Sequence, residues 1–403
     1  MLSVRFRIVT IVASQRSLTL VSPLRRFGLA AAILTLVPAI SLGAQTLPSW
    51  HAIVDRTITA DDANLSAVGQ LLLLPSGELA VVQNQEDEVR FIGPRADSVS
   101  ATFGHQGEGP GEFHALRWIG TQRGQFWIED VQLKRLTFMS AAHKLAKTLR
   151  EPTSVSMPGH GATNFAIVFI QGVTPDGGLI AEALRGVNQP RPSWATETEW
   201  QGDPFLNVDT AGMIRSIVAW VPKDPCLTTV TSSRGVSQFA TPFCSGNLVA
   251  IASDGTTIAI VVMDQVAHSY RVSSMKTNGD TAFSKHLSYA PQPIATARFD
   301  SVMKQRRESM AKRGTTWPSM KQPDGYPPFD RLVVGRDGTV WLGEYRTGTT
   351  RSWQVLDGTG KSIGTVQLPG NVDVQVADRS QIWGVARDAD GNESLDHYTL
   401  AAR

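Results

Sequence analysis

The sequence predicts an all-β chain, a six-bladed β-propeller with four-stranded antiparallel blades and one helical insertion near residues 294–313. Three observations support this: an apolar strand, a polar turn and a second apolar strand recur six times, a second turn follows each copy, and many strands are apolar at successive positions. Strands of the last kind are buried on both faces. Small sheets that are apolar on both faces can hide them by standing side by side around a closed ring.

The recurring unit carries Asp-Gly or a related pair at its turn, which is the strongest local signal of a β-hairpin. A tryptophan occupies one position of the second strand in three copies, as Trp127, Trp341 and Trp383. A further strand and turn follow each copy, so that two hairpins give four strands, the size of one blade. The six copies span residues 71–82, 118–128, 172–181, 248–262, 332–342 and 374–383.

The stretch 103–113 predicts a tight connection between two sheets. Its four glycines and one proline exclude a helix or a central strand, and a phenylalanine closes each end, where we expect apolar packing. His105, Glu108, Glu112 and His114 form the densest group of candidate ligand-binding side chains, because imidazole and carboxylate groups can hold zinc or another divalent ion. The alternative, which we prefer, is that the glutamates accept backbone hydrogen bonds within the turn.

Residues 294–313 predict the one helix. Apolar residues such as Phe299 and Met303 recur at helical intervals, Thr296 is the expected N-cap and Gly314 the expected stop. Six basic residues occupy the remaining surface. We expect this helix to lie on one rim with its charges solvated; the alternative is a basic face that meets a membrane or an acidic partner.

Residues 1–44 predict a signal peptide. A pair of arginines precedes the apolar run 27–42, and small residues follow it as a cleavage site. The run is short and contains Pro38, which favours cleavage over an uncleaved membrane anchor. We therefore predict an extracytoplasmic protein, periplasmic or secreted, whose residues 45–403 form a single propeller domain with no stable membrane insertion.

Charge and cysteine content limit the partners and the redox state. The chain has a net charge of +2, but without the five arginines of residues 1–44 it carries 33 basic and 36 acidic residues, a net charge of −3. Such a chain has no general attraction for nucleic acid. Cys226 and Cys244 are the two cysteines, and in an exported protein an even pair predicts a disulfide; the alternative is two buried thiols.

On these features the chain resembles six-bladed propellers of the NHL-repeat-like superfamily, in particular the exported versions of some environmental bacteria. The likeness covers about residues 50–403, and its matching pieces are residues 103–113, 332–342 and 242–260. Where that family often has arginine after Phe-Gly, this chain has His105. The resemblance implies that residues 50–54 close the ring as a strand of the last blade, beside residues 397–400.

Function is less determined than fold. Some propellers of this general shape hydrolyse lactones or cleave peptidyl hydroxyglycine with a metal held in the central channel; Glu129, Asp130, Asn207 and Asp209 are candidate ligands here, although we expect Asp130 to cap a turn. Known nucleophile, zinc, phosphate and dinucleotide motifs are absent from the sequence.

We therefore predict no catalytic residue, no metal ligand and no cofactor. The expected function is an exported, monomeric, non-catalytic binding or scaffold propeller that recognises a protein, peptide or glycan on a rim or at the channel mouth. The alternative is a metal-dependent, lactonase-like hydrolase or lyase with its site in the central channel.

Overall fold

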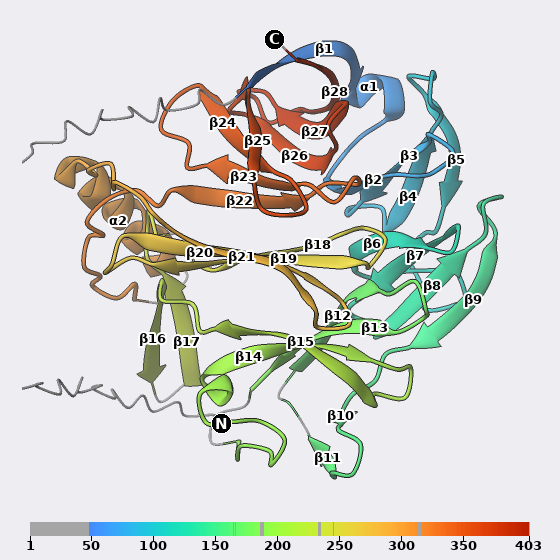
Figure 1. Cartoon of the computed structure of the whole chain (residues 1–403). Helices are drawn as coiled ribbons and strands as arrows, with labels where there is room; N and C mark the ends of the chain where they lie inside the picture. Colours follow the sequence, from blue (N-terminus) through green and yellow to red (C-terminus); the bar gives the residue numbers. More distant parts are fainter. Residues whose placement is uncertain are drawn as a thin grey trace, which may run out of the picture.

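The computed structural model describes residues 48–402, apart from residues 164, 166, 186–188, 233, 234, 245, 313 and 315. The predicted signal peptide lies outside the described residues. Four antiparallel sheets of four strands each follow one another along the chain and stand around a ring (Figure 1). Their strands are β2 (Val68–Leu73), β3 (Leu79–Gln83), β4 (Glu88–Ile92) and β5 (Val99–Phe103); β6 (Leu116–Gln122), β7 (Gln125–Asp130), β8 (Arg135–Met139) and β9 (Leu145–Arg150); β12 (Ile167–Val173), β13 (Leu179–Leu184), β14 (Gly202–Val208) and β15 (Ile214–Pro222); β18 (Leu248–Ile251), β19 (Thr257–Asp264), β20 (Ser269–Lys276) and β21 (Thr281–Ser288).

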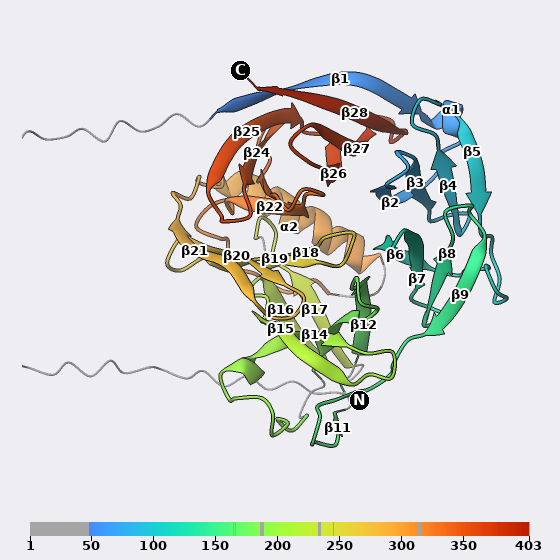
Figure 2. The same ribbon diagram turned by 45° about the vertical axis from the view of Figure 1, so that its right-hand side comes forward.

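An eight-stranded sheet completes the ring, and it is where the two ends of the described chain meet. Its order is β22-β23-β24-β25-β1-β28-β27-β26, so β1 lies between two runs of the sheet. β1 pairs antiparallel with β28 from Trp50 opposite Ala402 to Thr59 opposite Ser394, and it touches β25 in parallel through only two residue pairs. Figure 2 shows β1 and β28 as one long arc. These strands are β22 (Phe329–Val334), β23 (Val340–Glu344), β24 (Thr350–Leu356), β25 (Ser362–Pro369), β1 (Ser49–Thr59), β26 (Val372–Ala377), β27 (Gln381–Arg387) and β28 (Glu393–Ala402). The predicted closure by the N-terminal strand is confirmed.

Apolar side chains fill the boundaries between successive sheets. Among the described residues, six apolar clusters each join one group of four strands to the next group around the ring. Every group therefore has buried apolar side chains on both faces. Trp127, Trp341 and Trp383, which share one position of the repeat, are 2%, 0% and 5% exposed. The predicted ring of four-stranded antiparallel sheets, each apolar on both faces, is confirmed.

One long helix, two short helical segments and two small hairpins interrupt the ring among the described residues. The long helix α2 (Thr296–Ala311) confirms the predicted insertion, but its N-cap is Ala295 and not Thr296, because the Ala295 carbonyl already accepts the first bonds, from the N–H groups of Arg298 and Phe299. Gly314 follows the helix with a φ of 69°. The other elements are α1 (Ala60–Ala63), the 3₁₀ turn η1 (Glu199–Gln201), and the hairpins β10 (Val155–Ser156) with β11 (Ala162–Thr163) and β16 (Leu227–Ser232) with β17 (Gly235–Ala240).

The underside of α2 is apolar and part of its basic surface is engaged. Phe299 and Met303 are buried in a cluster with Phe243 and Trp317. Arg306 donates a hydrogen bond of 2.8 Å to the Ala240 carbonyl, and its guanidinium lies over the Trp317 ring. The expectation that all the basic side chains are solvated is therefore wrong for Arg306. Within the part of the chain that the structure describes, no helix has the length and apolar character needed to cross a bilayer.

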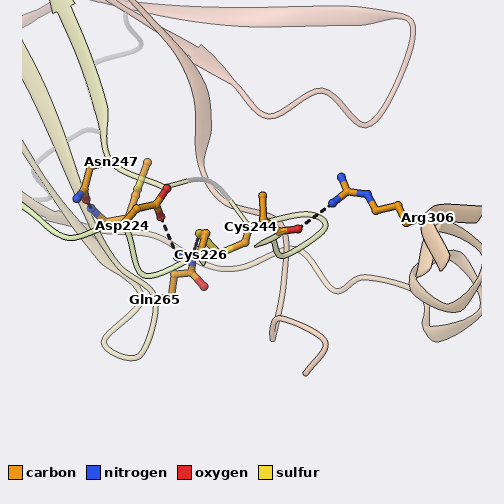
Figure 3. Close-up of a disulfide and its surroundings, with 8 residues drawn as sticks. Asp224, Cys226, Cys244, Asn247, Gln265 and Arg306 are labelled. Carbon is orange, nitrogen blue, oxygen red and sulfur yellow. Dashed lines mark hydrogen bonds between the residues drawn. A yellow bond between two sulfur atoms is a disulfide. The ribbon is translucent and has the colours of Figure 1, made fainter. Parts of the chain in front are cut away.

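The predicted disulfide between Cys226 and Cys244 is confirmed, with a Cα–Cα distance of 5.6 Å (Figure 3). The Asp224 carboxylate accepts a hydrogen bond from the Cys226 N–H, and the Gln265 amide lies against both sulfurs. The bridge joins the residue before β16 to the segment after β17 and so closes the base of this hairpin. Arg306 of α2 binds Ala240, the last residue of β17, and this bond links the hairpin to the helix.

Candidate functional site

The connection between β5 and β6 places the four predicted site residues in two separate pairs. His105 Nε2 lies 3.2 Å from Glu112 Oε1, and His114 Nε2 lies 3.7 Å from Glu108 Oε1. Glu112 Oε2 accepts a 2.7 Å bond from the Gly109 N–H, and this bond holds the pKa of Glu112 below its usual value. The four side chains thus do not converge as one ligand set, and Glu112 acts as expected of a turn residue.

Both ends of this connection are anchored. The Phe103 and Phe113 rings meet edge to face at 6.0 Å, and Phe113 is fully buried. Arg135 of β8 donates hydrogen bonds to the carbonyls of Glu108 and Gly109, at 2.8 and 2.7 Å. The predicted apolar packing at the two ends is confirmed, and the connection braces the boundary between two sheets.

Three of the loose channel candidates have structural roles. Asp130 accepts bonds from the N–H groups of Gln132, Leu133 and His114, so it caps a turn as expected. Asp209 likewise accepts two backbone bonds in the turn after β14. Asn207 donates its amide to the Thr277 carbonyl at 3.1 Å.

The space inside the ring contains a cavity that could hold a ligand. The first strand of each run faces this space (Figure 2), and together these strands line a cavity of about 500 Å³, within the usual range for small-molecule sites. Most of the lining is aliphatic, and every inner strand contributes, for example through Leu71, Arg117, Gln171, Ile251, Val333 and Gln375. We call this cavity the channel.

Two of the channel amides hold neighbouring sheets together. Gln375 of β26 accepts a 2.7 Å bond from the Leu71 N–H and donates to the Gly69 carbonyl at 3.0 Å. Gln70 of β2 accepts a 2.8 Å bond from the Ile119 N–H of β6. The carbonyl oxygens of both amides are therefore engaged with the backbone of the next sheet.

At the amino ends of β6 and β12 the channel carries an arginine backed by aromatic rings. The Arg117 guanidinium carbon lies 4.6 Å from the centroid of the Phe169 ring and 5.4 Å from that of Trp118. Lys134 also lies over Phe169, at 5.3 Å. Within the described residues Arg117 has no hydrogen-bond or ion-pair partner, and its side chain is exposed to the channel.

Two buried carboxyl groups lie behind Arg117. Glu129 of β7 and Glu151, the residue after β9, are 0% and 4% exposed, and no N–H or O–H of the described residues donates to any of their four oxygens. Burial, together with the neighbouring Glu151, raises the pKa of Glu129 to about 9, and burial raises the pKa of Glu151 to about 7. A proton on Glu129 supplies the missing donor, because Glu129 can then donate to the Glu151 carboxylate.

The charges around this acid pair are unequal. Lys134 lowers the pKa of Glu151 more than Arg117 does, whereas Arg117 lowers the pKa of Glu129 more than Lys134 does. A third acid, Glu182, accepts a hydrogen bond from Gln171, and its pKa is raised by burial and by Asp203. Arg117 acts on both Glu129 and Glu182, but no ion pair joins it to a described carboxyl group.

At the opposite mouth of the channel a backbone bond links two inner segments, and the arginine there is paired. The Thr121 N–H donates a 2.8 Å bond to the Ser253 carbonyl, linking β6 to the turn after β18 although these sheets are not consecutive. In the same turn, a Cβ on Gly255 would lie 2.0 Å from the Val173 carbonyl oxygen. Arg336 lines this mouth, with Nη1 3.7 Å from the Asp378 carboxylate.

The sequence pointed to Glu129 but to neither Arg117 nor Glu151. A carboxyl that directly follows the apolar run 126–128 is a usable signal, because an acid seldom lies in a buried strand without a reason. Arg117 directly precedes such a run and looks like an ordinary strand end. Glu151 gives no local signal, since its pairing with Glu129 depends on how β9 lies against β8.

No family model and no curated protein sequence matches the chain. Solved structures with a similar course of the chain include an exported protein of Bacteroides fragilis, at 10% identity, covering 90% of this chain and 97% of that one, with a TM-score of 0.44. A DUF4221 member of Bacteroides vulgatus is 8% identical and covers 89% and 100%, with a TM-score of 0.47. The calcium-binding protein regucalcin of Agrobacterium tumefaciens is 12% identical and covers 89% and 98%, with a TM-score of 0.38. None of these likenesses bears on the function of this chain.

Proposed function

We propose that the protein is an exported, non-catalytic binding propeller that holds its ligand, a protein segment, peptide or glycan, in the channel. The observation that carries the proposal is the channel itself: a cavity of about 500 Å³ lined by all the inner strands, with a mixed polar and apolar surface and, at one mouth, a guanidinium that no described residue pairs. Concave, mostly apolar spaces with a few fixed polar groups are the usual form of ligand sites.

The finer features of the fold belong to the same proposal. The short contact between β1 and β25 makes the eight-stranded sheet equivalent to two four-stranded runs, which gives six blades with the four separate sheets. Export rests on the sequence of residues 1–44, and the monomeric state and the kinship with NHL-type propellers rest on the sequence features given above.

The channel lining suits a metal-free site better than a metal site. A divalent ion held in a propeller channel needs several carboxylate, amide or imidazole donors. Among the described residues, no Asp, Glu or His lines the cavity. Two of the lining amides already bond backbone groups, and an arginine lies at each mouth. Among the described residues no three His, Cys, Asp or Glu side chains group as metal ligands. The residues present therefore do not fit the metal-dependent hydrolase or lyase, which is the competing hypothesis.

The experiment uses residues 45–403 purified from metal-supplemented medium. Thermal shift against a panel of peptides and oligosaccharides should find a ligand that raises the melting temperature. Ala250→Trp, which fills the channel from β18, should abolish that shift. Ala297→Trp, on the exposed surface of α2, is the matched control and should keep it.

Metal content distinguishes the two functions. The binding proposal expects well under one equivalent of divalent metal in the folded protein, by elemental analysis. A stoichiometric metal whose removal abolishes lactone or peptide cleavage would establish the hydrolase or lyase instead. A ligand shift that survives Ala250→Trp would move the site out of the channel and contradict the proposal.

A further inference from the structure

Arg117 is arranged as a receptor for an anion. Its guanidinium is held against the Phe169 ring at 4.6 Å and over the Trp118 ring at 5.4 Å, which restricts the orientation of the planar fork before any ligand arrives. Its N–H groups make no hydrogen bond to a described residue, although they line the channel. A planar fork with free donors matches the two oxygens of a carboxylate.

Arg117 forms no ion pair with a described acid. Burial beside Glu151 raises the pKa of Glu129, and burial also raises the pKa of Glu182, which accepts a hydrogen bond from Gln171 and on which Arg117 acts as well. Lys134, on the same aromatic ring, acts chiefly on Glu151. The contrast with Arg336 is direct, because that guanidinium has Asp378 as an ion-pair partner at the opposite mouth.

The walls beyond Arg117 include apolar surface that can take a ligand stem. Ile251 and Val333 line the channel and are partly exposed. A hydroxyl-rich ligand would need several polar partners, and the carbonyl oxygens of Gln70 and Gln375 are already taken by backbone N–H groups. An aliphatic stem needs no such partners and gains from leaving water.

Resting on the proposed channel binding, we propose that the channel recognises a carboxylate on an apolar stem, with Arg117 binding the carboxylate and the aliphatic walls taking the stem. This selects an aliphatic acid or an apolar peptide end over a glycan. Arg117 is the specificity-determining residue in this arrangement, and Phe169 is its positioning residue.

The test titrates residues 45–403 by calorimetry with octanoate, octan-1-ol, acetate and glucuronate at pH 6. Octanoate should bind about ten- to a hundredfold more tightly than octan-1-ol, as expected for hydrogen bonds to a charged group, and acetate and glucuronate should bind weakly. Arg117→Gln should remove the preference for octanoate while leaving octan-1-ol binding unchanged. Arg117→Lys, which keeps the charge but not the fork, should fall between the two.

Arg271→Gln is the matched control, because Arg271 is exposed on β20 and does not line the channel. Its affinities should equal those of the unaltered protein. Should Arg117→Gln unfold, Phe169→Leu provides a second variant, expected to weaken octanoate several-fold with Arg117 intact.

Three outcomes overturn the inference: equal affinity for octanoate and octan-1-ol, unchanged octanoate binding in folded Arg117→Gln, or tighter binding of glucuronate than of octanoate. If none of the four probes binds, a peptide or oligosaccharide can still raise the melting temperature of the unaltered protein but not that of Ala250→Trp. In that case the inference fails and channel binding stands. If octanoate binds equally well to Ala250→Trp, both fail.

Discussion

The Gln375 side chain of β26 accepts a 2.7 Å hydrogen bond from the backbone N–H of Leu71 in β2, across 304 positions of sequence. The same side chain donates to the Gly69 carbonyl at 3.0 Å. Gln70 makes the corresponding acceptor bond to Ile119 one sheet further on. Inner-strand amides thus set how one sheet is placed against the next, at the edge where the channel is lined.

Gln375→Ala should lower the free energy of unfolding by about 1–3 kcal/mol, because it leaves the Leu71 N–H without its partner in a partly buried position. Urea unfolding followed by tryptophan fluorescence measures the change. Gln305→Ala, on the exposed surface of α2, is the control and should change stability by less than about 0.5 kcal/mol. Equal effects of the two substitutions would show that the amide does not stabilise the boundary.

The turn at Gly255 should tolerate no side chain. Gly255 and Gly338 occupy equivalent turns with φ values of 67° and 77°, but a Cβ on Gly255 would lie 2.0 Å from the Val173 carbonyl, whereas a Cβ on Gly338 would meet nothing within 4 Å. Gly338→Ala should cost about 1–2 kcal/mol, for the left-handed conformation alone. Gly255→Ala should cost about 1–3 kcal/mol more, since the backbone must also move. Melting temperatures of the two variants provide the comparison, and similar values would contradict the close approach.

Reduction of the Cys226–Cys244 bridge should destabilise the protein. A bridge closing a separation of 18 positions contributes about 3 kcal/mol on the loop-entropy account. The double variant Cys226→Ser with Cys244→Ser should melt at the temperature of the reduced protein and be insensitive to dithiothreitol. If dithiothreitol still lowers the melting temperature of the double variant, the destabilisation does not come from this bridge, and the prediction is wrong.

The acid pair makes stability depend on pH. Burial raises the pKa of Glu129 to about 9 and of Glu151 to about 7, from a usual value of 4.5, so the folded chain retains protons that the unfolded chain releases. Their contribution is fully present below about pH 4.5 and is lost as the pH rises through 7 and 9. Arg117, Lys134 and Asp130 are the other charged groups that act on the pair.

Glu129→Gln should reduce this pH dependence, because the glutamine amide donates to Glu151 at every pH. Relative to the unaltered protein, the melting temperature of the variant should rise progressively between pH 5 and pH 9. Glu197→Gln, at an exposed position before η1, is the control and should leave the slope unchanged. A constant difference between the Glu129→Gln variant and the unaltered protein over this range would show that Glu129 is ionised throughout.

The repeat was predictable because hairpins are local. The Asp-Gly turns and the tryptophans at 127, 341 and 383 follow from strand periodicity and turn chemistry within a dozen residues. The packing of Phe103 on Phe113 was foreseeable for the same reason. The cap of α2 was misplaced by one residue because Thr296 is the stronger capping type, yet the Ala295 carbonyl accepts the first helical bonds.

The site was less predictable because it is assembled across the ring. The channel lining comes from inner strands that are separated by 40 or more positions, and a sequence does not reveal which side chains converge on an axis. Glu129 was predicted only as one of four candidate channel ligands, and its partner Glu151 and the aromatic support of Arg117 by Phe169 come from other parts of the chain. The predicted group around His105 was a sequence neighbourhood rather than a spatial one.

The antiparallel pairing of β1 with β28 has a consequence for biogenesis. The partner of β1 comes late: Thr57 and Asp396, which face each other in the two strands, are 339 positions apart, so the ring stays open until β28 has been made. Until Glu393–Ala402 has emerged, β1 lacks its main partner and is exposed to pairing with the same segment of another molecule. A delay before β28 becomes available would therefore favour intertwined dimers, in which each copy supplies β28 to its neighbour.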